Sequence, residues 1–160
     1  MENYGVKNIA NYVLKFFYDK EYTDDEFSSL EITNLKMQKV LYFLYGFYFS
    51  ETGKSLFSDD FIAWKYGPVI KEIYDINKNN ITNPYENLRK DIYSNYDFNI
   101  KNINWEIIDN ILNNIIKLSS WYLVNMSHKK NTPWEKTKEN EIISKDLIHD
   151  YFKNKELKEK

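Results

Sequence analysis

Residues 56–69 read Leu-Phe-Ser-Asp-Asp-Phe-Ile-Ala-Trp-Lys-Tyr-Gly-Pro-Val, a stretch that sets two large rings beside a Gly-Pro pair. Successive side chains of an extended chain point to opposite faces. The alternation therefore predicts a short extended segment around residues 61–66, with Trp64 and Tyr66 on one face. Two rings at this spacing form either a plug for the core or a pair of anchors, in which one ring covers the core and the other lines a groove for a partner.

The Gly-Pro pair predicts the end of this segment and a corner into a helix. Gly67 can take a backbone angle that other residues avoid. Pro68 has a fixed φ and no N–H, which suits the first position of a helix. We expect that helix to run from Val69 to about Lys78, so that the two rings are held at a strand-to-helix corner.

Spacing and capping residues predict that most of the chain is α-helical. Apolar residues recur three and four positions apart in an opening segment that ends near Lys20. A second helix, from a cap at Asn34 to a stop at Gly53, is apolar on most of its circumference, so we expect it at the centre. Later helices are expected after caps at Asn104, at Ser119 or Ser120, at Thr132 (the capping box Thr132-Pro133-Trp134-Glu135) and at Ser144. The predicted fold is mainly α, a compact single-domain helical bundle with a short extended segment around residues 61–66.

Length and composition limit the location and the domain count. A chain of 160 residues suits one domain, which we assign to residues 1–152, with a charged tail at 153–160 that is expected to fray. The absence of cysteine excludes disulfides and thiolate metal sites, and a reducing cytoplasm is the simplest location. The N-terminus lacks the features of a secretory signal. The longest apolar run, Val40 to Phe49, is about half the ~20 residues that a membrane helix requires.

Several kinds of site are disfavoured by the residues present. The net charge is −2 and the lysines are scattered among acids, so no basic stripe indicates nucleic-acid binding. The run Gly53-Lys54-Ser55 is not a phosphate loop, because Tyr48 stands where that motif needs its first glycine. Zinc would require both histidines and distant carboxylates. Ser127 and His128 are neighbours on a helix, where side chains point about 100° apart, so they do not form a nucleophile and its base. We expect no catalytic residue, cofactor or metal.

Two lysines near the start of the second helix do not stabilise that helix. Lys36 and Lys39 lie where a positive charge opposes the helix dipole. We expect them either to pair with acids, at Glu31 or at Asp59 and Asp60, or to face a binding partner.

Taken together, these segments resemble the Panacea, or SocA-like, antitoxin family of bacteria and their phages. The resemblance rests on the following pieces in this order: Thr33-Asn34, Leu35-Lys36-Met37-Gln38-Lys39, Gly53-Lys54-Ser55-Leu56-Phe57, Asp59-Asp60, Ala63 to Val69, and His128 followed by Pro133-Trp134. Met37 stands where such sequences often carry leucine, which conserves volume. The stretch between Asn77 and Asn104 shows no family pattern.

The resemblance implies an antitoxin that neutralises a co-encoded toxin by direct binding or, as in the SocA type, delivers the toxin to an ATP-dependent protease as an adaptor. The implied partners are the cognate toxin and that protease, with neither membrane nor nucleic acid. The alternatives are a phage-associated regulator and an uncharacterised small enzyme. The sequence lacks a basic recognition helix for the first and a nucleophile, base and orienting group for the second.

The family motifs also supply the candidate residues for partner binding, which are Lys36, Lys39, Trp64, Tyr66, Gly67, Pro68, His128 and Trp134. We expect Trp64 to stabilise the core, and Tyr66, His128 and Trp134 to reach a shared surface. His128 has two interpretations. In one its ring donates to a backbone carbonyl and packs on Trp134, and in the other it contacts the partner directly.

Overall fold

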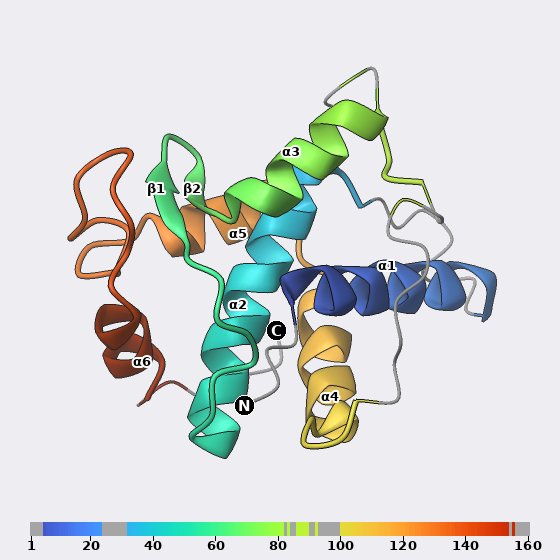
Figure 1. The fold of residues 1–160 in the computed structure, drawn as a ribbon, viewed down its shortest axis with the longest axis horizontal. Coiled ribbons are helices and arrows are strands. Elements are labelled where there is room, and N and C mark those ends of the chain that lie inside the picture. Colours follow the sequence, from blue (N-terminus) through green and yellow to red (C-terminus); the bar gives the residue numbers. More distant parts are fainter. Residues whose placement is uncertain are drawn as a thin grey trace.

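The computed structural model describes residues 5–23, 32–81, 83, 86–89, 92, 100–153 and 155, which form six helices and one hairpin (Figure 1). The elements are α1 (Val6–Thr23), α2 (Asn34–Thr52), β1 (Ile62–Trp64), β2 (Gly67–Val69), α3 (Lys71–Asn80), α4 (Trp105–Ile115), α5 (Ser120–Ser127) and α6 (Lys145–Lys153). The predicted mainly α fold is confirmed. Expectations for Glu31, for 12 of the 26 residues between Asn77 and Asn104, and for all but two residues of the tail fall outside the described residues.

Helix α2 lies at the centre, as its apolar circumference predicts, and contacts α1, α3, α4, α5, α6 and β2 (Figure 1). Fourteen of its residues are buried. Gly46 leaves room for the ring of Phe152 on α6, because a Cβ at this position would overlap that ring. None of the helices in the described ranges combines the length and hydropathy that a membrane crossing requires.

The ends of α2 confirm one predicted boundary residue and correct another. Gly53 ends the helix at φ 71°, and its N–H donates to Phe49 O. The predicted cap at Asn34 is wrong, because the cap is Thr33, whose hydroxyl accepts from the Lys36 N–H at 3.2 Å. Asn34 instead enters the helix and accepts from the side chain of Asn77 on α3 at 3.0 Å.

The predicted strand-to-helix corner is a β-hairpin. Strands β1 and β2 pair antiparallel, with Ala63 opposite Pro68, so Pro68 lies in a strand and is not the first residue of a helix. The fixed φ of proline suits an extended chain as well as a helix start, and strand pairing decides between them. Helix α3 begins two residues later than predicted, at Lys71. The extended segment ends at Trp64, so Tyr66 lies in the turn and does not share a strand face with Trp64.

Caps at Asn104 and Ser119 are confirmed, whereas the capping box at Thr132 produces only a turn. Asn104 accepts from Ile107 N–H, and Ser119 accepts from Tyr122 N–H. Thr132 accepts from Glu135 N–H at 3.3 Å, but the chain leaves the helical path after this turn. Residues 140–142 instead extend along the outer edge of β1 and exchange backbone hydrogen bonds with Ala63. Tertiary pairing therefore overrides the local helix signal.

Candidate partner-binding site

Gln38 of α2 fixes the point where β2 ends and α3 begins. Its side-chain oxygen accepts from the Ile70 N–H at 2.8 Å, and its amide nitrogen lies 3.3 Å from Ile70 O. Gln38 is 2% exposed, so both bonds are buried. Buried hydrogen bonds of this kind are costly to break, because the freed backbone groups find no water. Gln38 therefore fastens the hairpin to the central helix.

Lys39, the next residue of the same helix, is buried under the hairpin. Its side chain has no exposed surface, and Nζ donates to Pro68 O at 2.7 Å. Burial removes the ammonium from water and lowers the pKa of Lys39 to about 7. The expected pairing with Asp59 or Asp60 is not formed, since Asp59 accepts from the Val6 N–H and Asp60 lies 3.9 Å from Lys145.

Lys36 is also buried, on another side of α2. Its Nζ lies 3.4 Å from Ile116 O at the end of α4 and 5.4 Å from the centre of the Phe17 ring on α1. The contacts with a carbonyl and a ring face stabilise a positive charge. Lys36 thus joins α1, α2 and α4, away from the hairpin.

Gly67 allows the hairpin to approach both α2 and α5. Its φ is 108°, a conformation that residues with a side chain rarely adopt. A Cβ at this position would lie 2.7 Å from Ser127 Oγ and 2.8 Å from Lys39 Cε. Both the backbone angle and the space therefore require glycine.

His128 and Trp134 form a stack that is bonded to the same hairpin at Trp64. The rings of His128 and Trp134 are parallel within 12°, with centroids 3.8 Å apart, and Trp134 Nε1 donates to Trp64 O at 2.6 Å. The predicted packing of His128 on Trp134 is confirmed. The predicted carbonyl bond is not formed by Nε2, which is buried without a partner in the described part of the chain. Burial and, secondly, the charge of Lys39 lower the pKa of His128, so the ring is neutral at neutral pH.

Besides Tyr66 in its turn, six of the eight predicted site residues meet at the hairpin: Lys39, Trp64, Gly67, Pro68, His128 and Trp134. They are buried or half-buried, and Trp64 is half-buried with its ring edge-on to Tyr74. Tyr66 is the one candidate with a broadly exposed side chain, at 47%.

Sequence reasoning missed Trp121, which is 57% exposed and whose ring meets Tyr66 edge-on at 5.7 Å. A signal was available in the helix phase, because Leu123, Val124 and Ser127 define the buried face of α5 and Trp121 lies to one side of it.

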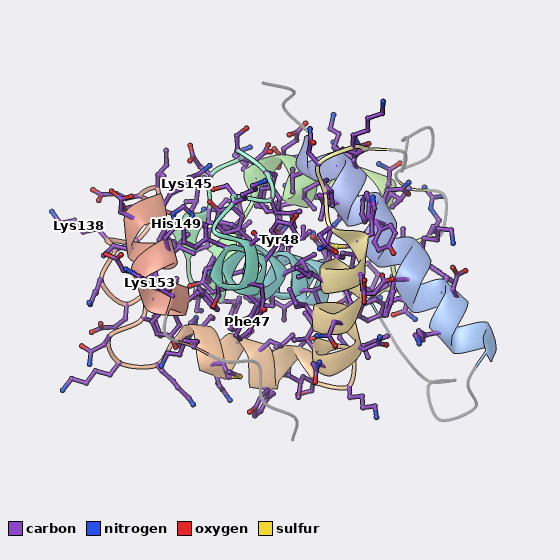
Figure 2. The ribbon with its side chains drawn as sticks, turned by 90° about the horizontal axis from the view of Figure 1, so that it is seen from below. Phe47, Tyr48, Lys138, Lys145, His149 and Lys153 are labelled. Carbon is purple, nitrogen blue, oxygen red and sulfur yellow. The ribbon has the colours of Figure 1, made fainter. Side chains whose placement is uncertain are left out.

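A second polar cluster, also absent from the sequence-based prediction, joins α2 to α6. His149 points from α6 toward α2 (Figure 2), stacks on Phe49 at 3.7 Å and has its Nε2 2.9 Å from Tyr45 OH. Ser55 Oγ lies 3.2 Å from Tyr45 OH and 3.4 Å from Nε2. These contacts fix the position of α6. Within the described ranges, no three acids or histidines are placed to hold a metal ion.

The buried Lys39 predicts a stability that rises with pH. Between pH 7 and about 10.5 the unfolded chain keeps a proton that the folded chain has lost, so the free energy of unfolding should increase by up to about 1.4 kcal/mol per pH unit. Urea unfolding at pH 7, 8 and 9 measures this slope. The measurements stop at pH 9 because burial raises the pKa of Tyr42. At higher pH the tyrosine ionises in the unfolded chain first, which lowers the free energy of unfolding and opposes the effect of Lys39.

The matched variant for this experiment is Lys39→Met, which keeps most of the side-chain volume and removes the titrating group. Its free energy of unfolding should change little between pH 7 and 9, whatever its absolute value. An equal slope in both proteins would show that Lys39 keeps its ordinary pKa in the folded state.

The chain resembles one family of known proteins. Residues 37–135 match the family described as "Antitoxin SocA-like, Panacea domain". The chain belongs to this family. The matched span begins in α2 and ends in the turn after Trp134, so it contains the hairpin and all eight candidate residues except Lys36.

Among curated proteins, the chain is similar to "Antitoxin SocA" of Caulobacter vibrioides (strain NA1000 / CB15N). The two are 32% identical over 113 residues, which cover 66% of this chain and 60% of that relative. The aligned part thus spans well under two thirds of the relative's length. No solved structure matches the chain.

Proposed function

We propose that this protein is an antitoxin that neutralises a toxin encoded beside it by direct binding. The match of residues 37–135 to the SocA-like Panacea family carries the proposal, and the similarity to a protein named Antitoxin SocA supports it. The toxin is the proposed partner. An ATP-dependent protease is a second proposed partner if the chain acts as an adaptor.

The geometry of the hairpin supports a role in binding. Gln38 and Lys39 hold it from α2, and Trp134 holds it through the carbonyl of Trp64. A surface fixed in advance loses little conformational entropy when a partner docks. In this proposal Tyr66 touches the toxin directly. Most of the other motif residues act by keeping the hairpin in place.

We also propose that the protein acts without catalysis. The described residues place one serine hydroxyl near a histidine base, with Ser55 Oγ 3.4 Å from His149 Nε2. Tyr45 OH lies closer to the same Nε2, at 2.9 Å, and competes for it. Because the Tyr45 hydroxyl is hydrogen-bonded to this nitrogen, the histidine is better placed for a structural role than for activating the serine.

Co-expression with the product of the adjacent reading frame tests the antitoxin function. We expect that product to arrest growth when expressed alone, growth to be restored when this protein is present, and the two to co-purify after size exclusion. The proposal fails if the neighbour is harmless alone, or if its toxicity persists while this protein is abundant and folded.

The same cells separate direct neutralisation from delivery to a protease. Direct binding predicts that growth is restored in strains lacking each ATP-dependent protease and that the toxin accumulates in the complex. Delivery predicts a short toxin half-life that depends on this protein, and a loss of protection in one protease-deficient strain. Pulse-chase labelling of the toxin measures the difference.

A further inference from the structure

Two large aromatic side chains lie together on the surface at the hairpin turn. Tyr66 is 47% exposed and Trp121 is 57% exposed, and their rings meet edge-on with centroids 5.7 Å apart. Exposed aromatic side chains of this size are enriched at the energetic centres of protein interfaces. We call these two residues the Tyr66–Trp121 pair.

Both members of the pair are held on rigid parts of the fold. Tyr66 lies in the turn between β1 and β2, directly before Gly67, which packs on Ser127 of α5. Trp121 lies in the first turn of α5, where Ser119 caps the helix. The hairpin turn and α5 therefore form one surface, to which segments distant in sequence contribute (Figure 1).

The segments that carry the pair have a local excess of positive charge. Residues 61–71 and 110–134 contain no Asp or Glu but five lysines, at 65, 71, 117, 129 and 130, in a chain whose net charge is −2. Lys71 is paired with Asp75 at 2.6 Å. Lys65 lies over the Tyr66 ring at 5.4 Å, and Lys129 and Lys130 are exposed just beyond Ser127, which contacts the hairpin.

Two acidic residues lie close to these segments, one along β1 and one in the turn after α5. Glu141 pairs through its backbone with Ala63 on the outer edge of β1, opposite the edge that pairs with β2. Glu135 folds back to accept from the Asn131 N–H. The segments around the pair therefore combine two exposed aromatic rings with the exposed Lys65, Lys129 and Lys130, while the Glu135 carboxylate is engaged by a backbone N–H, a distribution that suits an acidic partner.

We propose that the Tyr66–Trp121 pair is the docking surface for an acidic segment of the toxin, one that places an apolar side chain against the two rings and carboxylates against Lys65, Lys129 and Lys130. This rests on the proposed antitoxin function. The aromatic pair supplies most of the affinity, because its apolar area is exposed before binding. The lysines supply orientation and association rate.

Binding of purified variants to the product of the adjacent reading frame tests the inference. Tyr66→Ala and Trp121→Ala should each weaken binding at least about tenfold with an unchanged melting temperature, while Trp121→Phe should retain most of the affinity. The matched control is Ile142→Ala, because Ile142 is 59% exposed but lies on the outer edge of β1.

Charge is tested separately. The combined variant Lys65→Glu/Lys129→Glu/Lys130→Glu should slow association about tenfold at low salt and reduce its dependence on salt concentration. The control is Lys54→Glu, an exposed lysine just beyond the opposite end of α2 (Figure 1). If the triple variant and Lys54→Glu slow association equally, the proposal that the partner segment is acidic is overturned.

A photo-crosslinking residue at position 66 directly identifies the molecule that binds the Tyr66–Trp121 pair. We expect a crosslink to a toxin peptide that contains Asp or Glu, and no toxin crosslink from position 142. A crosslink to a second copy of this chain, or toxin binding within twofold of wild type by both alanine variants, overturns the inference while the antitoxin function stands. If wild-type protein does not bind the toxin, the proposed function fails and the docking surface fails with it.

Discussion

Replacing Phe152 by alanine is expected to lower the free energy of unfolding by about 3 to 5 kcal/mol, most of the stability of a domain at the lower end of the usual range. Phe152 is 1% exposed and its ring lies 5.1 Å from Phe47 and 5.6 Å from Tyr42, both on α2. The ring also fills the space left by Gly46. Its loss creates a cavity that the surrounding rings cannot close without moving α2.

Urea unfolding followed by circular dichroism measures this effect, and Lys153→Ala is the control, because Lys153 is the exposed neighbour on the same helix. The control should change stability by less than about 0.5 kcal/mol. Helix α6 lies beyond the span that matches the family, so this experiment also asks whether the chain outside that span belongs to the core. A Phe152→Ala protein that unfolds near the wild-type midpoint would mean that α6 does not pack on α2 as described.

Gly67→Val should have the second large effect, a loss of at least about 3 kcal/mol. A branched side chain at φ 108° adds backbone strain of about 1 to 3 kcal/mol, and its contact with Ser127 and Lys39 adds an overpacking cost of similar size. The expected result is a protein that is destabilised and whose hairpin is displaced from α5.

Gly53→Ala separates the two causes. Gly53 has a φ of 71° but nothing within 4 Å of an added Cβ, so this variant carries strain without a collision and should cost about 1 to 2 kcal/mol. Thermal and urea unfolding of both variants give the comparison. If Gly67→Val costs no more than Gly53→Ala, the hairpin is not pressed against α5 and Lys39 at this position.

Local signals predicted the helical part of the fold well. The left-handed stop at Gly53 and the caps at Asn104 and Ser119 are formed as predicted, because each depends on residues within one turn of chain. The central position of α2 followed from its apolar circumference. These features need no knowledge of distant segments.

The hairpin could not be predicted in the same way. Pro68 satisfies a helix start and a strand equally well, and pairing with β1 together with residues 140–142 determines which one forms. The burial of Lys39 was equally hidden, because its acceptor is the carbonyl of Pro68, 29 residues away in sequence. Two lysines at similar positions in one helix therefore looked like surface charges. Trp121 was missed because no family motif contains it.

The hydrogen bond from Trp134 to the carbonyl of Trp64 joins residues 70 positions apart, and Ile142 then pairs with Ile62. As the chain leaves the ribosome, β1 and β2 appear long before Trp134 and Ile142 are made. The bonds from Trp134 and Ile142 therefore form late in translation, when α2 can already hold the hairpin. A nascent chain that stops short of this point carries most of the family sequence and can hold the hairpin through α2, but it lacks the bonds to the Trp64 carbonyl and along the outer edge of β1.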